Sequence, residues 1–110
     1  MAKLERRSSA WDINTLRSRI MDGILNGSAS ASLEEESFFS SGNAQCCTMV
    51  FERYSMMGSN RVSLTVTLFQ AEGGPVYLSG ITAGGSQAMF FKVNTFGEEA
   101  FLDKLRELLA

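Results

Sequence analysis

The segment that most constrains the fold is residues 61–69, where apolar and polar side chains alternate without interruption. The apolar set is Val62, Leu64, Val66 and Leu68, and the polar set between them is Ser63, Thr65 and Thr67. Successive side chains of a strand point to opposite faces of a sheet, so this period of two predicts a strand with one buried and one wet face. Such a strand is typical of an antiparallel sheet.

Two segments near the ends of the chain have a helical period instead. Ser9 or Asp12 can cap the start of the first helix, and Asn26-Gly27 predicts its end. In the second, Thr95 followed by Glu98 fits a capping box, which predicts a helix that begins at Thr95. The two apolar stripes are Ile13, Leu16, Ile20 and Ile24, and then Phe101, Leu102, Leu105, Leu108 and Leu109.

Further strands are predicted over 28–33, 45–54, 76–83 and 87–93, with a short one over 3–7. Turn residues separate most of them: Ser41-Gly42-Asn43, Gly58-Ser59-Asn60, Gly73-Gly74-Pro75 and Gly84-Gly85. The predicted order is β-α-β-β-β-β-β-α, with five or six strands in one domain over residues 1–110. Short turns favour an antiparallel meander, and both helices need its one apolar face. The predicted class is therefore α+β, with two helices packed on one face.

The other face of this sheet carries more large apolar groups than a solvated face should. Some lie out of phase with the buried set, and the pairs Phe38-Phe39 and Met56-Met57, close to predicted loops, add to the surplus. We expect a homodimer to cover part of this face, since twofold dimers are the commonest oligomers. The candidate ligand or interface residues are Tyr54, Phe69, Tyr77, Ile81, Gln87 and Phe90.

Glu52 and Arg53 are charged residues in the middle of a predicted strand. Neighbours alternate between faces, so one of the two points inward or toward an adjacent strand. One interpretation is a cross-strand ion pair, for instance Glu52 with Arg61. The other is a polar lining for a cavity beneath the C-terminal helix, with Tyr54, Tyr77 and Gln87 as companions.

No residue set typical of catalysis or of metal binding stands out. The chain has no histidine to activate Cys46 or Cys47, and two cysteines fall short of a zinc site. Glu34-Glu35-Glu36 is interpreted as a solvated edge or turn. Gly84-Gly85-Ser86 precedes a predicted strand rather than a helix, which favours a hairpin turn over a phosphate loop. We therefore expect no catalytic residue, no metal and no cofactor.

Charge and hydropathy bound the partners and the compartment. Twelve acids against ten bases give a net charge of −2, which offers no broad footprint for nucleic acid. Five bases fall in the first 19 residues and are interpreted as a solvated helix face. No apolar region of a secretory signal and no run near the ~20 apolar residues of a membrane span is present. We expect a cytosolic protein with reduced thiols and no membrane partner.

Several runs resemble a family of small uncharacterised bacterial proteins, known as a domain of unknown function. They are 51–54, 60–64, 81–87 and 91–102, in which the Gly-Gly-Ser-Gln and Asn-Thr-x-Gly-Glu segments carry a resemblance that spans nearly the whole chain. It implies a standalone cytosolic protein and supplies no activity, cofactor or catalytic residue. The element order also resembles the TATA-binding-protein-like and helix-grip topologies, in which a curved antiparallel sheet wraps a long C-terminal helix. That likeness concerns the fold alone.

The leading functional hypothesis is a non-enzymatic interaction module that acts as a homodimer. The alternative is a carrier of a small apolar ligand, held in a cavity between the curved sheet and the C-terminal helix. A carrier of this kind needs a pocket of roughly 300 Å³ or more.

Overall fold

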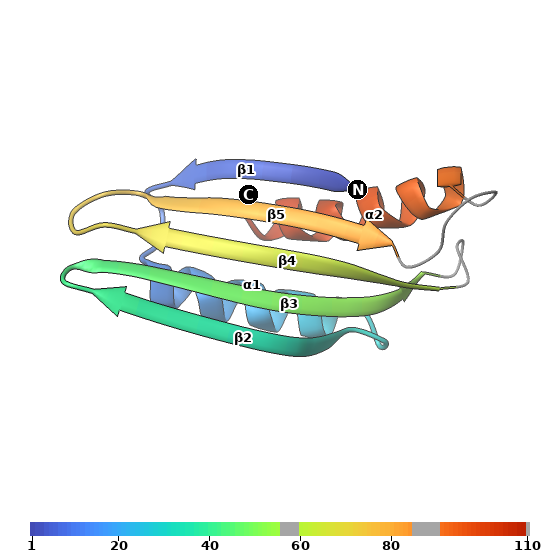
Figure 1. Ribbon diagram of the computed structural model, residues 1–110, viewed down its shortest axis with the longest axis horizontal. Helices are drawn as coiled ribbons and strands as arrows, with labels where there is room; N and C mark the ends of the chain where they lie inside the picture. The colour runs from blue at the N-terminus through green and yellow to red at the C-terminus, as the bar shows by residue number, and fades with distance from the viewer. Residues whose placement is uncertain (56–59, 85–90, 110) are drawn as a thin grey trace.

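The computed structural model describes residues 1–55, 60–84 and 91–109, with only the backbone for 91–96. These residues form one five-stranded antiparallel sheet and two helices that lie behind it in Figure 1. The α+β class and the two helices on one face are therefore confirmed. The elements are β1 (Ala2–Ser8), α1 (Ile13–Gly27), β2 (Ser32–Ser41), β3 (Ala44–Ser55), β4 (Asn60–Gln70), β5 (Val76–Gly84) and α2 (Phe91–Leu108).

The strands lie in the order β1-β5-β4-β3-β2, all neighbours antiparallel. Strands β2 to β5 make the predicted meander, and β1 closes the opposite edge by pairing with β5 (Figure 1). Helix α1 carries the chain from the β1 edge to the β2 edge, and it contacts β2, β3 and β4. Helix α2 contacts β5, β4 and β1, and also α1. Strand β4 is thus the centre of the sheet.

The predicted alternation in β4 is confirmed: its four apolar residues have no exposed surface and face the helices. The stripe of α1 is buried as predicted, and Asp12 caps the helix by accepting a hydrogen bond from the Thr15 amide at 3.4 Å. Turns at Gly42 and Gly73 have positive φ angles of 56° and 71°, a backbone conformation that glycine adopts without strain.

Helix α2 packs closely against the sheet. A Cβ atom on Gly80 of β5 would lie 2.5 Å from Leu105 Cδ2, well inside van der Waals contact. Leu102 and Leu105 are fully buried there. At this place the space between sheet and helix is filled by side chains, which argues against the cavity that a ligand carrier needs.

The predicted strand over 28–33 is wrong over most of its length. The Ala31 amide donates to the Ser28 carbonyl at 3.2 Å, so 28–31 form a turn and β2 starts only at Ser32. Strand β2 instead runs through Glu34-Glu35-Glu36, because its backbone pairs with β3 over nearly its whole length. Cross-strand pairing overrides the low strand propensity of glutamate here.

The predicted strand over 87–93 and the predicted cap at Thr95 are also wrong where they can be compared. Residues 85–90 lie outside the described residues, but 91–93 open α2, and Thr95 is inside this helix. Both edges of β5 are occupied, by β1 and by β4, so no edge is left for a strand that follows it. Glu98 acts elsewhere: its Oε2 accepts a hydrogen bond from the Gly84 amide at 2.6 Å.

Candidate functional site

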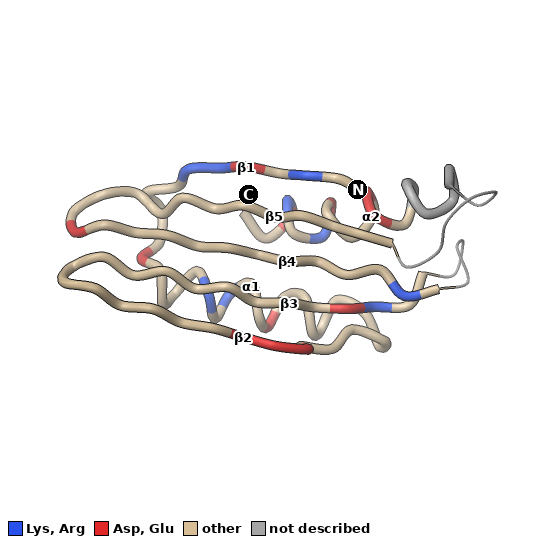
Figure 2. The backbone as a smooth tube through the Cα atoms, in the orientation of Figure 1, with Lys and Arg blue, Asp and Glu red and all other residues tan. Residues whose placement is uncertain are grey.

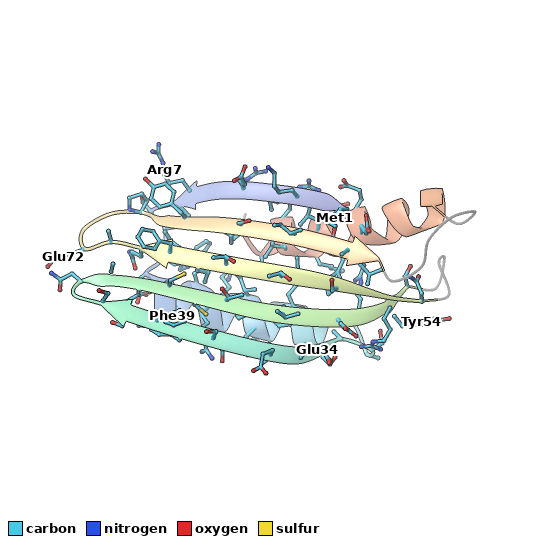
Figure 3. All side chains as sticks on the ribbon, in the orientation of Figure 1. Met1, Arg7, Glu34, Phe39, Tyr54 and Glu72 are labelled. Carbon is cyan, nitrogen blue, oxygen red and sulfur yellow. The ribbon has the colours of Figure 1, made fainter. Side chains whose placement is uncertain are left out.

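The face of the sheet turned away from the helices is open among the residues that the structure describes (Figures 1 and 3). Within the sheet, the charged residues lie on the edge strands β1 and β2 and at one end of β3 and β4 (Figure 2). The middle of the face is formed by β3, β4 and β5, where hydroxyl, apolar and aromatic side chains predominate. This open face is the candidate interaction surface.

Strand register aligns the outward-pointing side chains in rows across the sheet. At the end of the sheet near the β4–β5 turn, one such row is aromatic. Phe69 pairs with Tyr77 on one side and with Cys46 on the other, and Cys46 pairs with Phe39. We call these four residues the aromatic row; Arg7, opposite Tyr77, extends it onto β1.

The aromatic row is strongly exposed. Phe39 is 70% exposed, Tyr77 49% and Phe69 41%. The rings of Phe69 and Tyr77 are 6.5 Å apart between centroids, which is the distance of an interacting aromatic pair. Exposed large hydrophobic side chains gathered in one patch are typical of an interaction site.

A shallow depression of about 100 Å³ lies within this row. It is too small for a drug-sized ligand, which needs roughly 300–1,000 Å³, and its size suits a single side chain. The residues that line it are Phe39, Ser41, Ala44, Gln45, Cys46 and Phe69.

The structure brings together some of the predicted candidates and separates others. Phe69 and Tyr77 are neighbours in the aromatic row, and Ile81 lies on the same face two rows away. Tyr54 is also exposed but lies at the opposite end of the face, opposite Arg61. Gln87 and Phe90 lie outside the described residues.

The predicted ion pair between Glu52 and Arg61 is present. Arg61 Nε lies 2.8 Å from Glu52 Oε1 on the open face. Arg53 points to the helix side, where its guanidinium carbon lies 4.5 Å from the Phe101 ring centroid and desolvation lowers its pKa. Tyr54 lies on the open face, so the proposed polar cavity of Arg53 with Tyr54 is wrong.

The two cysteines point to opposite faces, as expected for neighbours in a strand, and both are free thiols. Cys47 is fully buried, with its Sγ 3.9 Å from Glu36 Oε2. Burial, and secondarily the Glu36 carboxylate, raise the pKa of the Cys47 thiol. A thiol that stays protonated is a poor nucleophile, so Cys47 acts as a small core residue.

Two of the basic residues near the N-terminus make contacts with other side chains of the chain. Arg17 forms a two-point ion pair with Glu36 of β2, with Nη2 2.6 Å from Glu36 Oε1. The Arg19 guanidinium lies 4.8 Å from the centroid of the Trp11 ring. The interpretation as a solvated helix face is therefore wrong for Arg17, which joins α1 to β2, whereas Arg19 is exposed and agrees with it.

Within the described ranges, no three histidine, cysteine, aspartate or glutamate side chains gather closely enough to hold a metal ion. Glu34 and Glu35 are exposed on the edge strand β2, in agreement with a solvated edge. Over the same ranges, no helix is long and apolar enough to cross a membrane.

Phe39 is the residue of the candidate surface that the sequence does not predict. The sequence places Phe38-Phe39 close to a loop, because its residue pattern does not predict a strand over 32–41. Phe38 pairs with the buried Cys47 and so points to the helix side, whereas Phe39 pairs with Cys46 and points to the open face. The adjacency of two phenylalanines was the available signal, but only the register assigns them to opposite faces.

Comparison with known proteins identifies the family. The chain matches the family of unknown function DUF6054 over residues 1–110, and it therefore belongs to this family. No curated protein and no solved structure matches the chain. The predicted resemblance to a family of unknown function is confirmed, whereas bacterial origin and the likeness to TATA-binding-protein-like folds stay predictions.

Proposed function

We propose that this member of DUF6054 is a non-enzymatic interaction module that acts as a homodimer through the open face of its sheet. The aromatic row carries the proposal, because three large rings on one face stand between 41% and 70% exposed. Burying such a side chain contributes roughly 1.5–3 kcal/mol relative to leaving it in water. A second copy supplies the cover that the chain itself does not provide within its described residues.

The size of the face suits a stable dimer. Five strands spaced about 4.8 Å apart, over about eight residues of about 3.3 Å each, present roughly 600 Å² of sheet per copy. Interfaces of standard size bury about 800 Å² per partner. Side chains that protrude from the sheet add to this flat area. Face-to-face packing of two sheets can therefore bury the area of a standard interface.

The chemistry of the described side chains supports binding rather than catalysis. The buried thiol of Cys47 has a raised pKa, and Arg17 holds the Glu36 carboxylate beside it in an ion pair. Neither group is set up as a nucleophile or a general base with an adjacent substrate pocket. The depression in the aromatic row fits one side chain.

We also propose that the protein is cytosolic. Two free thiols, one of them partly exposed on the open face, support a reducing compartment. Fractionation of the source cells tests this: recovery of the native chain from a secreted fraction with Cys46 oxidised contradicts it.

A matched pair of substitutions tests the dimer. Phe39→Thr removes an aromatic ring from the open face, and Phe38→Thr removes its neighbour from the helix side of the same strand. We expect sedimentation equilibrium to give Phe39→Thr a dimer dissociation constant about tenfold or more above that of the wild type, which is a loss of roughly 1.4 kcal/mol or more of binding free energy. Phe38→Thr keeps the wild-type dissociation constant. Equal effects of the two substitutions contradict an interface on the open face.

A further inference from the structure

Read from β1 to β2, the outward-pointing side chains of the open face are complementary to the same side chains in reverse order. From this order we propose that two copies pack face to face about a twofold axis that runs along β4. This inference rests on the proposed homodimer and specifies its geometry. A twofold axis that runs parallel to the strands over the central strand exchanges β5 with β3 and β1 with β2. Each row across the sheet then meets the same row of the second copy, in reverse order.

The aromatic row fits this arrangement. Phe69, on the axis, meets Phe69 of the second copy, and Tyr77 comes to lie opposite Cys46. The depression of about 100 Å³ is lined by Cys46, Phe39 and Phe69, so it receives the ring of Tyr77 from the second copy. Both depressions of the dimer are filled by the same contact.

At the edge of the same row, Arg7 comes to lie over Phe39 of the second copy. Phe39 is the most exposed ring of the row at 70%, and a guanidinium above an aromatic face is a favourable contact. The most exposed ring of the row thus gains a cationic partner from the other copy.

A second row, which lies four residues away from the aromatic row along each strand, shows the same complementarity in charge. Its order from β1 to β2 is Lys3, Ile81, Thr65, Val50 and Glu35. Reversal places Lys3 opposite Glu35, Ile81 opposite Val50 and Thr65 opposite itself. Opposite charges meet at both edges, and apolar side chains meet between them. Aligned sheets cross at about 30°, and the long lysine and glutamate side chains reach across the resulting offset at the edges.

The other symmetric arrangement, with the axis across the strands, lacks this match. Each strand then faces itself in the reverse direction, and the aromatic row lies over Ser32, Glu52 and Ser63. A carboxylate and two hydroxyls are poor partners for aromatic rings, because their hydration is lost without replacement. In that arrangement Lys3 faces Glu5 rather than Glu35.

Charge reversal separates the two arrangements. We expect Lys3→Glu and Glu35→Lys, each alone, to weaken dimerisation about tenfold at low salt, since each creates two like-charge contacts per dimer. The double variant Lys3→Glu with Glu35→Lys returns to within about threefold of wild type. Glu34→Lys, at the register shift beside Glu35, serves as the charge control and does not rescue Lys3→Glu. Sedimentation equilibrium measures all four, with circular dichroism to confirm folding.

Cross-linking gives a second readout that needs no charge change. With Tyr77→Cys, a short bis-maleimide joins position 77 of one copy to native Cys46 of the other, and Cys46→Ser abolishes the product. The axis along β4 is overturned if the double charge reversal does not restore dimerisation, or if the cross-link is absent from a dimeric sample. A wild-type chain that sediments only as a monomer defeats the homodimer itself, which is a different outcome.

Discussion

The Glu98 carboxylate of α2 accepts a hydrogen bond from the backbone amide of Gly84, at the end of β5, over 2.6 Å. Glu98 is only 5% exposed, and its other oxygen lies 2.6 Å from the α-amino nitrogen of Met1. This one side chain therefore joins α2 to the end of β5 and to the start of β1. The contact closes the sheet on the helices at the end farthest from the aromatic row.

Glu98→Ala is expected to destabilise the fold by about 1.5–3 kcal/mol, because a charged acceptor is lost and a backbone donor is left without its partner. Chemical denaturation by urea measures the change. Glu99→Ala, at the exposed neighbouring position, is the control and stays within about 0.5 kcal/mol of wild type. A Glu98→Ala protein as stable as its control contradicts the role of this contact.

Glycine substitutions test the packing of the helices. Gly80→Ala places a methyl group 2.5 Å from Leu105 Cδ2, which is fully buried and has no free space to move into. We expect a loss of about 1–3 kcal/mol. Gly23→Ala meets Leu108, which is only partly buried and can shift, and it gains up to about 1 kcal/mol of helix propensity. Thermal unfolding measures the melting temperature of both variants. A lower melting temperature for Gly23→Ala than for Gly80→Ala contradicts a filled interface between sheet and helix.

The ion pair between Arg17 and Glu36 makes stability depend on pH. Hydrogen bonding to Arg17 lowers the pKa of Glu36 below the 4.5 that is usual for a glutamate. A depressed pKa in the folded state means that the contribution is complete above the unfolded pKa and is lost as pH falls through the folded one. We expect this partly exposed pair to contribute about 1 kcal/mol or less.

Glu36→Gln tests this pH dependence. Urea unfolding at about pH 7 and at about pH 3 compares the stability of each protein above the pKa of Glu36 in the unfolded state with its stability after acidification below that pKa. The difference in unfolding free energy between wild type and Glu36→Gln becomes smaller as the pH falls. A gap that widens on acidification contradicts the assigned direction of the pKa shift.

The two thiols should react very differently. Cys47 is fully buried with a raised pKa, whereas Cys46 is partly exposed on the open face. We expect mass spectrometry after maleimide treatment to find one label per folded chain, on Cys46, and a second only in denaturant. The proposed dimer covers Cys46, so we expect its labelling to slow as the protein concentration rises. Equal labelling of the two positions in the folded protein contradicts this difference.

The sequence patterns that predicted the fold correctly are those in which burial follows a simple period. The alternation of β4 and the stripe of α1 fix which side chains face the core, and cap chemistry at Asp12 fixes the start of α1. The predicted strand over 28–33 failed because alternating serine and alanine indicate no burial. The Thr95 cap failed because Glu98 contacts Gly84, 14 residues earlier in the chain.

The candidate site was predictable only in part, for a related reason. Phase along one strand places Phe69 and Tyr77 on the open face, which the sequence already indicated. Their grouping with Phe39 and Cys46 depends on the register among four strands and on β2 being a strand at all. Register is set by long-range pairing, which no local pattern of residues around Phe39 reveals.

The most direct test of the homodimer is the mass of the unaltered protein in solution, measured by light scattering over a range of concentrations. An open face covered by a second copy predicts a mass rising to twice the chain's 12.0 kDa. The rise is reversed by Phe39→Thr and not by Phe38→Thr. A mass that stays at 12.0 kDa up to high micromolar concentration contradicts the account.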